Sequence, residues 1–278
     1  MTFLIRWLSN LSLPWMQRIG WLLGWLTWVL SPRYRKHFQE QSRQAGYSFQ
    51  QVRGAVGAAG CQALESFRVW FGAPMPVQWN GKQHITQAYA RGKGVLFLTP
   101  HLGCFEITAP SGASQFGQAH GPMTVLYRPA RQAWLKNLLL HAREKPFLKA
   151  VPASMDGVRQ LLKALRRGHS VGLLPDQVPP HGMGMWSSMW GQPAYTMTLG
   201  AKLALQTGAK ILLAWGERLP GASGYCIHVQ PMDEELSDDL ATAVLQINTA
   251  MESLIRQCPD QYLWGYARFK QPRREAML

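Results

Sequence analysis

From Gly81 onward the chain alternates between short apolar runs and longer segments with helical spacing. The apolar runs have the length and aliphatic content of buried strands, and they cover residues 94–99, 123–127, 171–174, 210–214 and 225–230. The helix-length segments lie near residues 102–117, 131–145, 154–168, 196–207 and 237–257. Strands separated by helices are typical of βαβ units, whose strands run parallel. The pattern therefore predicts an α/β fold with a mainly parallel sheet flanked by helices.

Residues 34–72 precede this alternation and have helical character. Within them, Gly54, Gly57 and Gly60 superficially resemble a glycine-rich phosphate-binding loop. Because no strand precedes these glycines, close packing between helices is the better interpretation. No repeat or low-complexity linker divides the rest of the chain, so residues 34–278 are predicted to form one domain.

The first 33 residues are mostly apolar. Only 14 uncharged residues separate Arg18 from Arg33, fewer than the about 20 that a helix needs to cross a bilayer. Basic residues follow at once, which argues against a cleaved signal peptide. The spacing of Trp21, Trp25 and Trp28 places three indole rings on one helical face. Indole rings favour the headgroup region of a bilayer. We therefore predict that residues 1–33 form a membrane-anchor helix in the interface; a true span or a core helix of a soluble domain are the alternatives.

The composition is strongly basic. The 278 residues carry 29 Lys and Arg against 15 Asp and Glu, a formal net charge of +14. Residues 1–150 hold 17 of the basic residues and four of the acidic ones, a net charge of +13, whereas residues 151–278 have a net charge of +1. Such asymmetry indicates an acidic partner, which the charge alone leaves open as anionic lipid, nucleic acid or an acidic carrier protein.

Several functional classes lack their signatures. The four cysteines form no CxxC pair and the histidines no HExxH motif, so we expect no metal and no cofactor. The basic and aromatic pattern of common RNA-binding folds is missing, which disfavours nucleic acid as the partner. No GxSxG motif follows a predicted strand, which disfavours an α/β-hydrolase.

Charged or titratable side chains follow three of the predicted strands. His101 and Glu106 come after the first strand, Arg128 after the second and Asp176 after the third. Ligands of parallel α/β sheets bind beyond the carboxyl ends of the strands, so these four residues are the candidate site.

His101 and Glu106 suit acid–base chemistry. Pro100 and Gly103 favour a turn, which would place Glu106 in the first turn of the following helix. A carboxylate beside an imidazole fixes its tautomer and stabilises the imidazolium, which makes the histidine a general base. The alternative from the residues alone is an isolated histidine and an unrelated surface glutamate.

The residues from His101 to Glu106 resemble a motif of a known family. His101-Leu-Gly-Cys-Phe-Glu106 matches the HxxxxD/E motif of glycerolipid and lysophospholipid acyltransferases. Three further blocks follow in order: VLYRP ending at Pro129, LLPDQ ending at Gln177, and YLWGYARFK ending at Lys270. Together they resemble the bacterial late (lauroyl/myristoyl) acyltransferases of lipid A biosynthesis.

The resemblance implies a glycerol-3-phosphate acyltransferase-like fold and transfer of a fatty acyl chain from acyl carrier protein to a hydroxyl of a lipid A precursor. It implies His101 as the base, Glu106 as its partner, and Arg128 and Asp176 as substrate-binding residues. The location would be the cytoplasmic face of the inner membrane, on an anionic surface. Direct transfer by a general base needs no covalent intermediate, so no serine nucleophile is required.

Two features depart from the family pattern. Gln177 stands where many members have histidine, and the segment Pro179–Trp190 is rich in Met and Trp, which suggests either an acyl-chain wall or ordinary core. The alternatives are therefore a lysophospholipid or other lipid acceptor, acyl-CoA as the donor, and, more distantly, a non-catalytic basic membrane-binding protein.

Overall fold

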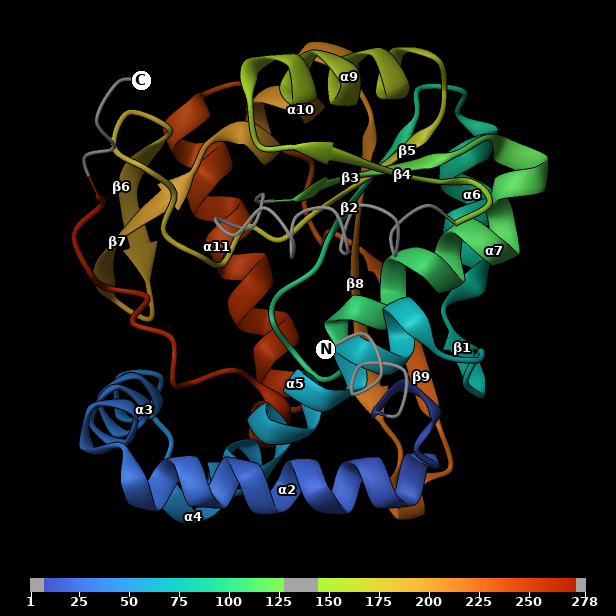
Figure 1. Ribbon diagram of the computed structural model, residues 1–278. Helices are drawn as coiled ribbons and strands as arrows, with labels where there is room; N and C mark the ends of the chain where they lie inside the picture. The colour runs from blue at the N-terminus through green and yellow to red at the C-terminus, as the bar shows by residue number, and fades with distance from the viewer. Residues whose placement is uncertain (1–7, 128–144, 274–278) are drawn as a thin grey trace.

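The computed structural model describes residues 8–127 and 145–273 and contains a seven-stranded sheet in the order β1-β9-β8-β2-β5-β3-β4 (Figure 1). All neighbouring strands pair in parallel except β8 and β9, so the predicted mainly parallel sheet is confirmed. The strands are β1 (Val77–Asn80), β2 (Val95–Leu98), β3 (Met123–Tyr127), β4 (Leu148–Pro152), β5 (Ser170–Leu173), β8 (Lys210–Arg218) and β9 (Tyr225–Pro231).

Helices cover both faces of this sheet. The α-helices after the N-terminal one are α3 (Pro32–Gln44), α4 (Phe49–Val52), α5 (Gly54–Phe71), α6 (Lys82–Ala90), α7 (Thr108–His120), α9 (Met155–Arg166), α10 (Leu199–Thr207) and α11 (Leu240–Gln257). Three short 3-10 turns are η1 (Phe105–Ile107), η2 (Pro220–Ala222) and η3 (Pro259–Gln261). The predicted helix at residues 131–145 lies almost wholly outside the described residues.

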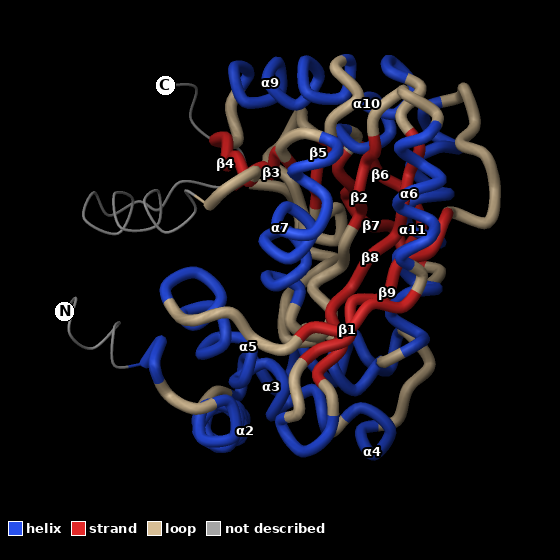
Figure 2. Tube along the Cα trace, turned by 90° about the vertical axis from the view of Figure 1, so that its right-hand side faces the viewer, coloured by secondary structure: helices blue, strands red, loops and turns tan. Residues whose placement is uncertain are grey.

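Alternate residues of the central strands point into two different cores. Leu96 and Leu98 of β2 pack with α9, α10 and α11, whereas Val95 and Phe97 pack with α6 and α7. All four are buried, which explains why the strand is a continuous apolar run rather than an alternating one. Figure 2 shows the helices on the two sides of the sheet.

A small antiparallel hairpin, formed by β6 (Gly184–Met189) and β7 (Gln192–Met197), was not predicted. Trp190 and Gly191 at its turn both have positive φ, as in the two-residue turns that suit hairpins. The Met- and Trp-rich segment therefore divides. Met189 and Trp190 belong to the core, whereas Trp186 is exposed. Ordinary core thus accounts for part of the segment.

The N-terminal helix α2 (Leu13–Leu30) packs along α5 at the opposite end of the molecule from α9 and α10 (Figure 1). The two helices meet at glycines: a Cβ atom on Gly60 would lie 2.0 Å from the Gly20 carbonyl oxygen, and one on Gly57 would lie 2.0 Å from the Trp21 ring. This close approach confirms the interpretation of the glycine-rich segment as a helix-packing surface.

The indole stripe predicted for α2 is only partly exposed. Trp21 is 43% exposed, but Trp28 stacks on Phe49 with ring centroids 4.9 Å apart, and Trp25 packs against the same ring. The outer face is instead mainly aliphatic and comprises Leu22, Leu23, Leu26, Val29 and Leu30, together with Trp15 near the start of the helix. Within the described ranges, no helix has the length and hydrophobicity needed to cross a membrane. The division of the chain at residue 33 stays a prediction.

Candidate active site

The parallel pairing of β2 and β5 brings two of the predicted site residues together. Leu98 pairs with Leu173 at the ends of the two strands, and the Thr99 amide continues the ladder by donating to the Leu173 carbonyl oxygen at 3.0 Å. The chain after β2 then reaches His101, and the chain after β5 reaches Asp176. Both lie beyond the carboxyl ends of adjacent strands, where ligand sites of such sheets form.

His101 and Asp176 form a two-point contact. The Nδ1 atom of His101 lies 2.7 Å from Oδ1 of Asp176, and the backbone amide of His101 donates to Oδ2 at 2.8 Å. The Asp176 side chain is 2% exposed and the His101 side chain 14% exposed. The Tyr262 hydroxyl adds a third donor to Oδ2 at 3.3 Å. The carboxylate is thus fully engaged and holds the imidazole in one orientation.

These contacts keep Asp176 ionised. Burial by itself would raise the pKa of Asp176, but the charge of His101, its two hydrogen bonds and the more distant Arg268 together lower the pKa below its usual value. An ionised carboxylate only accepts hydrogen bonds. The proton between the two side chains therefore sits on Nδ1 of His101.

When the ring carries only the proton on Nδ1, its Nε2 atom presents a lone pair. The Gln177 side-chain amide lies 2.9 Å from this atom and is positioned to donate to it. An imidazole with an orienting carboxylate on Nδ1 and a lone pair on Nε2 has the arrangement that general bases use. Gln177, which departs from the family pattern, therefore contacts the imidazole nitrogen on the side away from Asp176.

Glu106 does not share this contact. It lies in η1, and its Oε2 accepts a hydrogen bond of 2.9 Å from the Trp70 indole on α5. Across residues 8–127 and 145–273, no hydrogen bond joins Glu106 to His101. The structure thus supplies Asp176 as the carboxylate next to the imidazole, where the sequence analysis expected Glu106.

The turn that carries His101 is held by the last block of the chain. Gly103 has φ +62°, and a Cβ atom there would lie 1.9 Å from the Gly216 carbonyl oxygen, so only glycine fits. The Gly103 amide donates to the Gln261 carbonyl oxygen, and Leu263 donates to that of His101, both at 3.1 Å. Gln261 and the YLWGYARFK block that follows it therefore hold the turn of His101 in place.

A buried ion pair, which the sequence analysis missed, supports the same turn from behind. Arg218 Nε lies 2.7 Å from a carboxylate oxygen of Glu65, and Arg218 Nη2 donates to the Gly103 carbonyl oxygen at 2.9 Å. Burial alone would lower the pKa of Arg218, but the Glu65 carboxylate raises it above its usual value. No spacing in the sequence pairs these two residues, because they are 153 positions apart.

Arg128 lies outside the described residues. Within the part of the chain that is described, no cluster of three His, Cys, Asp or Glu side chains is arranged to hold a metal ion.

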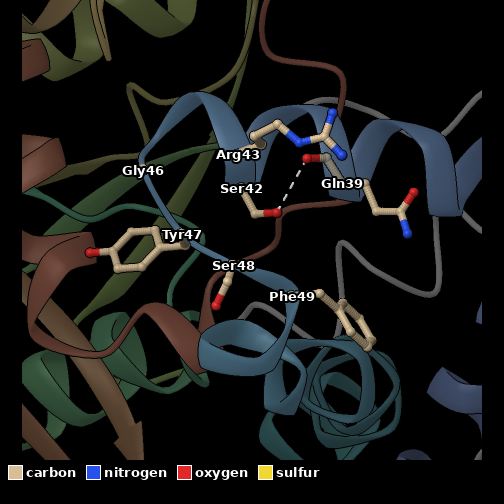
Figure 3. A pocket seen from close by; sticks show the side chains of 7 residues that line it. All are labelled: Gln39, Ser42, Arg43, Gly46, Tyr47, Ser48 and Phe49. Atoms are coloured by element: carbon tan, nitrogen blue, oxygen red, sulfur yellow. Dashed lines mark hydrogen bonds between the residues drawn. The ribbon is translucent and has the colours of Figure 1, made fainter.

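A shallow hollow of about 360 Å³ lies between the end of α3 and α4 (Figure 3). Arg43, Tyr47 and Phe49 are among its lining residues, and the Ser42 hydroxyl donates to the Gln39 carbonyl oxygen at its edge. None of the four candidate site residues lines it.

Comparison with known proteins gives relatives of one kind. A lipid A biosynthesis lauroyltransferase of Escherichia coli K12 is 28% identical over 244 residues, covering 84% of this chain and 73% of the relative. A lipid A biosynthesis palmitoleoyltransferase of the same strain is 24% identical over 216 residues, covering 76% and 68%. A lipid A biosynthesis acyltransferase of Haemophilus influenzae is 26% identical over 187 residues, covering 67% and 57%.

The family described as bacterial lipid A biosynthesis acyltransferase matches residues 51–271. That range includes β2 and β5, the turn with His101, Asp176, and the braces at Arg218 and Gln261. The match spans most of the chain and confirms the family indicated by the HLGCFE, VLYRP, LLPDQ and YLWGYARFK blocks. The chain belongs to the bacterial lipid A biosynthesis acyltransferase family and is an acyltransferase.

Proposed function

We propose that this protein transfers a fatty acyl chain from acyl carrier protein to a hydroxyl of a lipid A precursor, with His101 as general base and Asp176 as its orienting carboxylate. The observation that carries the proposal is the contact of His101 Nδ1 with Asp176, which leaves Nε2 as the atom that accepts a proton once the Gln177 amide is displaced from it. The names of the relatives support the acceptor.

The proposed step is direct. The acceptor hydroxyl takes the place of the Gln177 amide at Nε2 and gives up its proton there as its oxygen attacks the acyl thioester carbon. The Asp176 carboxylate stabilises the imidazolium that forms. The tetrahedral oxyanion then collapses, the carbon–sulfur bond breaks, and the proton on Nε2 passes to the leaving thiolate. The ester forms without an acyl-enzyme, and His101 returns to its starting state.

This assignment changes the role first expected for Asp176. The sequence analysis placed it with substrate binding, whereas its two hydrogen bonds to His101 favour a role in orienting the base. Glu106, fixed by Trp70 near the same turn, stays a predicted catalytic residue, and Arg128 a predicted substrate-binding residue.

The donor and the location rest on charge and on α2. Acyl carrier proteins are strongly acidic, and the net charge of +13 in residues 1–150 favours their docking. The same charge favours the anionic cytoplasmic leaflet of the inner membrane. The exposed aliphatic face of α2, with Leu22 67% and Leu30 70% exposed, fits a helix lying in the interface rather than crossing it.

A transfer assay tests the proposal directly. Purified protein would receive labelled acyl groups on acyl carrier protein or on coenzyme A, with a lipid A precursor or a lysophospholipid as the acceptor, and His101→Ala as the inactive control. We expect transfer from acyl carrier protein to the precursor and none by the control. Transfer only to the lysophospholipid, or only from coenzyme A, would overturn the proposed acceptor or donor.

A conservative change at Trp70 tests the part played by Glu106. Trp70→Phe keeps an aromatic ring but removes the indole N–H that donates to Glu106. Hydrogen bonds to charged groups contribute about 1.5–3 kcal/mol, so we expect kcat to fall about tenfold or more if Glu106 acts in the transition state. Trp79→Phe is the matched control, since Trp79 packs edge-on against Phe116 away from the turn. An unchanged kcat in Trp70→Phe would show that the hydrogen bond from Trp70 to Glu106 does not contribute to catalysis.

A further inference from the structure

A second, larger cavity of about 710 Å³ lies against α2, and His101 is not among the residues that line it. Its walls come from α2, from the first half of α5, and from the η2 turn that follows β8. The apolar lining comprises Trp15, Trp21, Leu22, Ala58, Pro220 and Ala222. The volume falls within the range of about 300–1,000 Å³ that is usual for small-molecule sites.

The cavity is amphipathic. Its lining also includes Gln17, Arg18, the exposed Asp260 and, at the inner end, Arg218 with Gln261. Arg18 is exposed and lies over the Trp15 ring, 5.4 Å from the ring centroid. Among the described residues, Arg18 has no carboxylate within salt-bridge distance, so its charge is available to an anion at the cavity rim.

The rim of the cavity is continuous with the exposed face of α2. Trp15 is 58% exposed and Leu22 67% exposed, and both line the cavity while belonging to that outer face. The apolar face continues past the cavity to Val29 and Leu30. If α2 lies in the interface, as proposed above, the rim meets the bilayer at the depth of headgroups and upper acyl chains.

We propose that this cavity binds one acyl chain of an anionic membrane phospholipid, with the headgroup phosphate at Arg18. The apolar walls take the chain and the free guanidinium takes the phosphate, a geometry that arginine serves well. The inner end lies against Arg218 and Gln261, which also hold the turn of Gly103. A lipid chain in the cavity would therefore contact the two residues that hold the turn of His101. The proposal rests on the membrane location but not on the acyl-transfer chemistry.

Photolabelling of the full chain tests the site. The protein would be bound to vesicles of phosphatidylglycerol and phosphatidylethanolamine that contain a trace of phosphatidylglycerol with a diazirine near the end of one acyl chain. After irradiation, peptide mass spectrometry locates the label. We expect label on Ala58 and Cys61, which line the cavity and are 5% and 3% exposed, so that a chain reaches them only from inside the cavity.

Two variants separate cavity filling from membrane binding. Ala58→Phe fills the cavity from α5 and is expected to abolish labelling of Cys61 while leaving co-sedimentation with vesicles unchanged. Leu22→Ser and Leu30→Ser remove the same side chain from the same helix at 67% and 70% exposure, but only Leu22 lines the cavity. Both should weaken vesicle binding to a similar degree, and only Leu22→Ser should lower the Cys61 label per bound protein.

Each contrary result would overturn a specific part of the proposal. Label confined to the outer face of α2, or unchanged in Ala58→Phe, would mean that no chain enters the cavity. Equal labelling from phosphatidylcholine vesicles would show that the site does not require an anionic headgroup. Labelling by a lipid A precursor that carries the same diazirine, and not by phosphatidylglycerol, would show that the occupant is not a phospholipid. Absence of vesicle binding would overturn both this site and the membrane location, while acyl transfer measured in detergent would still judge the chemistry on its own.

Discussion

Asp176→Asn is expected to lower kcat for acyl transfer by about 10²–10⁴-fold, the range that a positioned general base contributes, with little change in the fold. The two carboxylate oxygens of Asp176 accept from two N–H groups of His101, at 2.7 and 2.8 Å. Asparagine offers one acceptor and one donor in their place. Either the backbone amide then faces an NH₂ group, or the imidazole takes the tautomer with its proton on Nε2, which cannot accept another.

Controls make this result specific. Asp233→Asn changes the same group at an exposed position and should leave kcat unchanged. His101→Ala should be as inactive as Asp176→Asn, and the double variant should be no worse than either, because the two residues act as a unit. Glu106→Gln provides the opposing case. Loss of activity in Glu106→Gln together with normal turnover by Asp176→Asn would return the role of the histidine partner to Glu106.

The sequence located the strand exits but not their pairing. His101 and Asp176 were both chosen because each follows an apolar run that forms a strand. Their contact depends on β2 and β5 being neighbours, although β3 and β4 lie between them along the chain. Strand order comes from packing of the whole sheet, which local periodicity does not encode. Glu106, five residues from His101, was the nearer candidate in sequence and not the one in contact.

The helix-packing role of the glycines was predicted correctly from their local sequence. Gly57 and Gly60 were assigned to helix packing because no strand precedes them, and α2 does lie on them. The tryptophans of α2 show the limit of such arguments. Helical spacing put Trp25 and Trp28 on one face with Trp21, but it could not show that Phe49 would bury that side. The β6–β7 hairpin was missed because its turn is Trp190-Gly191 rather than Asn-Gly or Asp-Gly.

Arg218→Met is expected to lower the free energy of unfolding by about 3–5 kcal/mol, because it leaves the Glu65 carboxylate buried without its cation. Glu65 is fully buried and Arg218 nearly so, and their closest atoms are 2.7 Å apart. Replacing both, as Glu65→Leu with Arg218→Met, removes the uncompensated charge and should recover a large part of the stability. Urea denaturation of the wild type, both single variants and the double variant gives the coupling energy between the two side chains.

The same set of variants separates stability from positioning of the catalytic turn. Lys36→Met breaks an exposed pair with Glu40, 3.8 Å apart, and should cost only about 0.3–0.5 kcal/mol. A loss no larger than this in Arg218→Met would refute the importance of the buried pair. The double variant, even when folded, still lacks the Arg218 donor to the Gly103 carbonyl oxygen. Its kcat should therefore fall while its stability recovers, because Gly103 fixes the turn from which His101 reaches the acceptor hydroxyl.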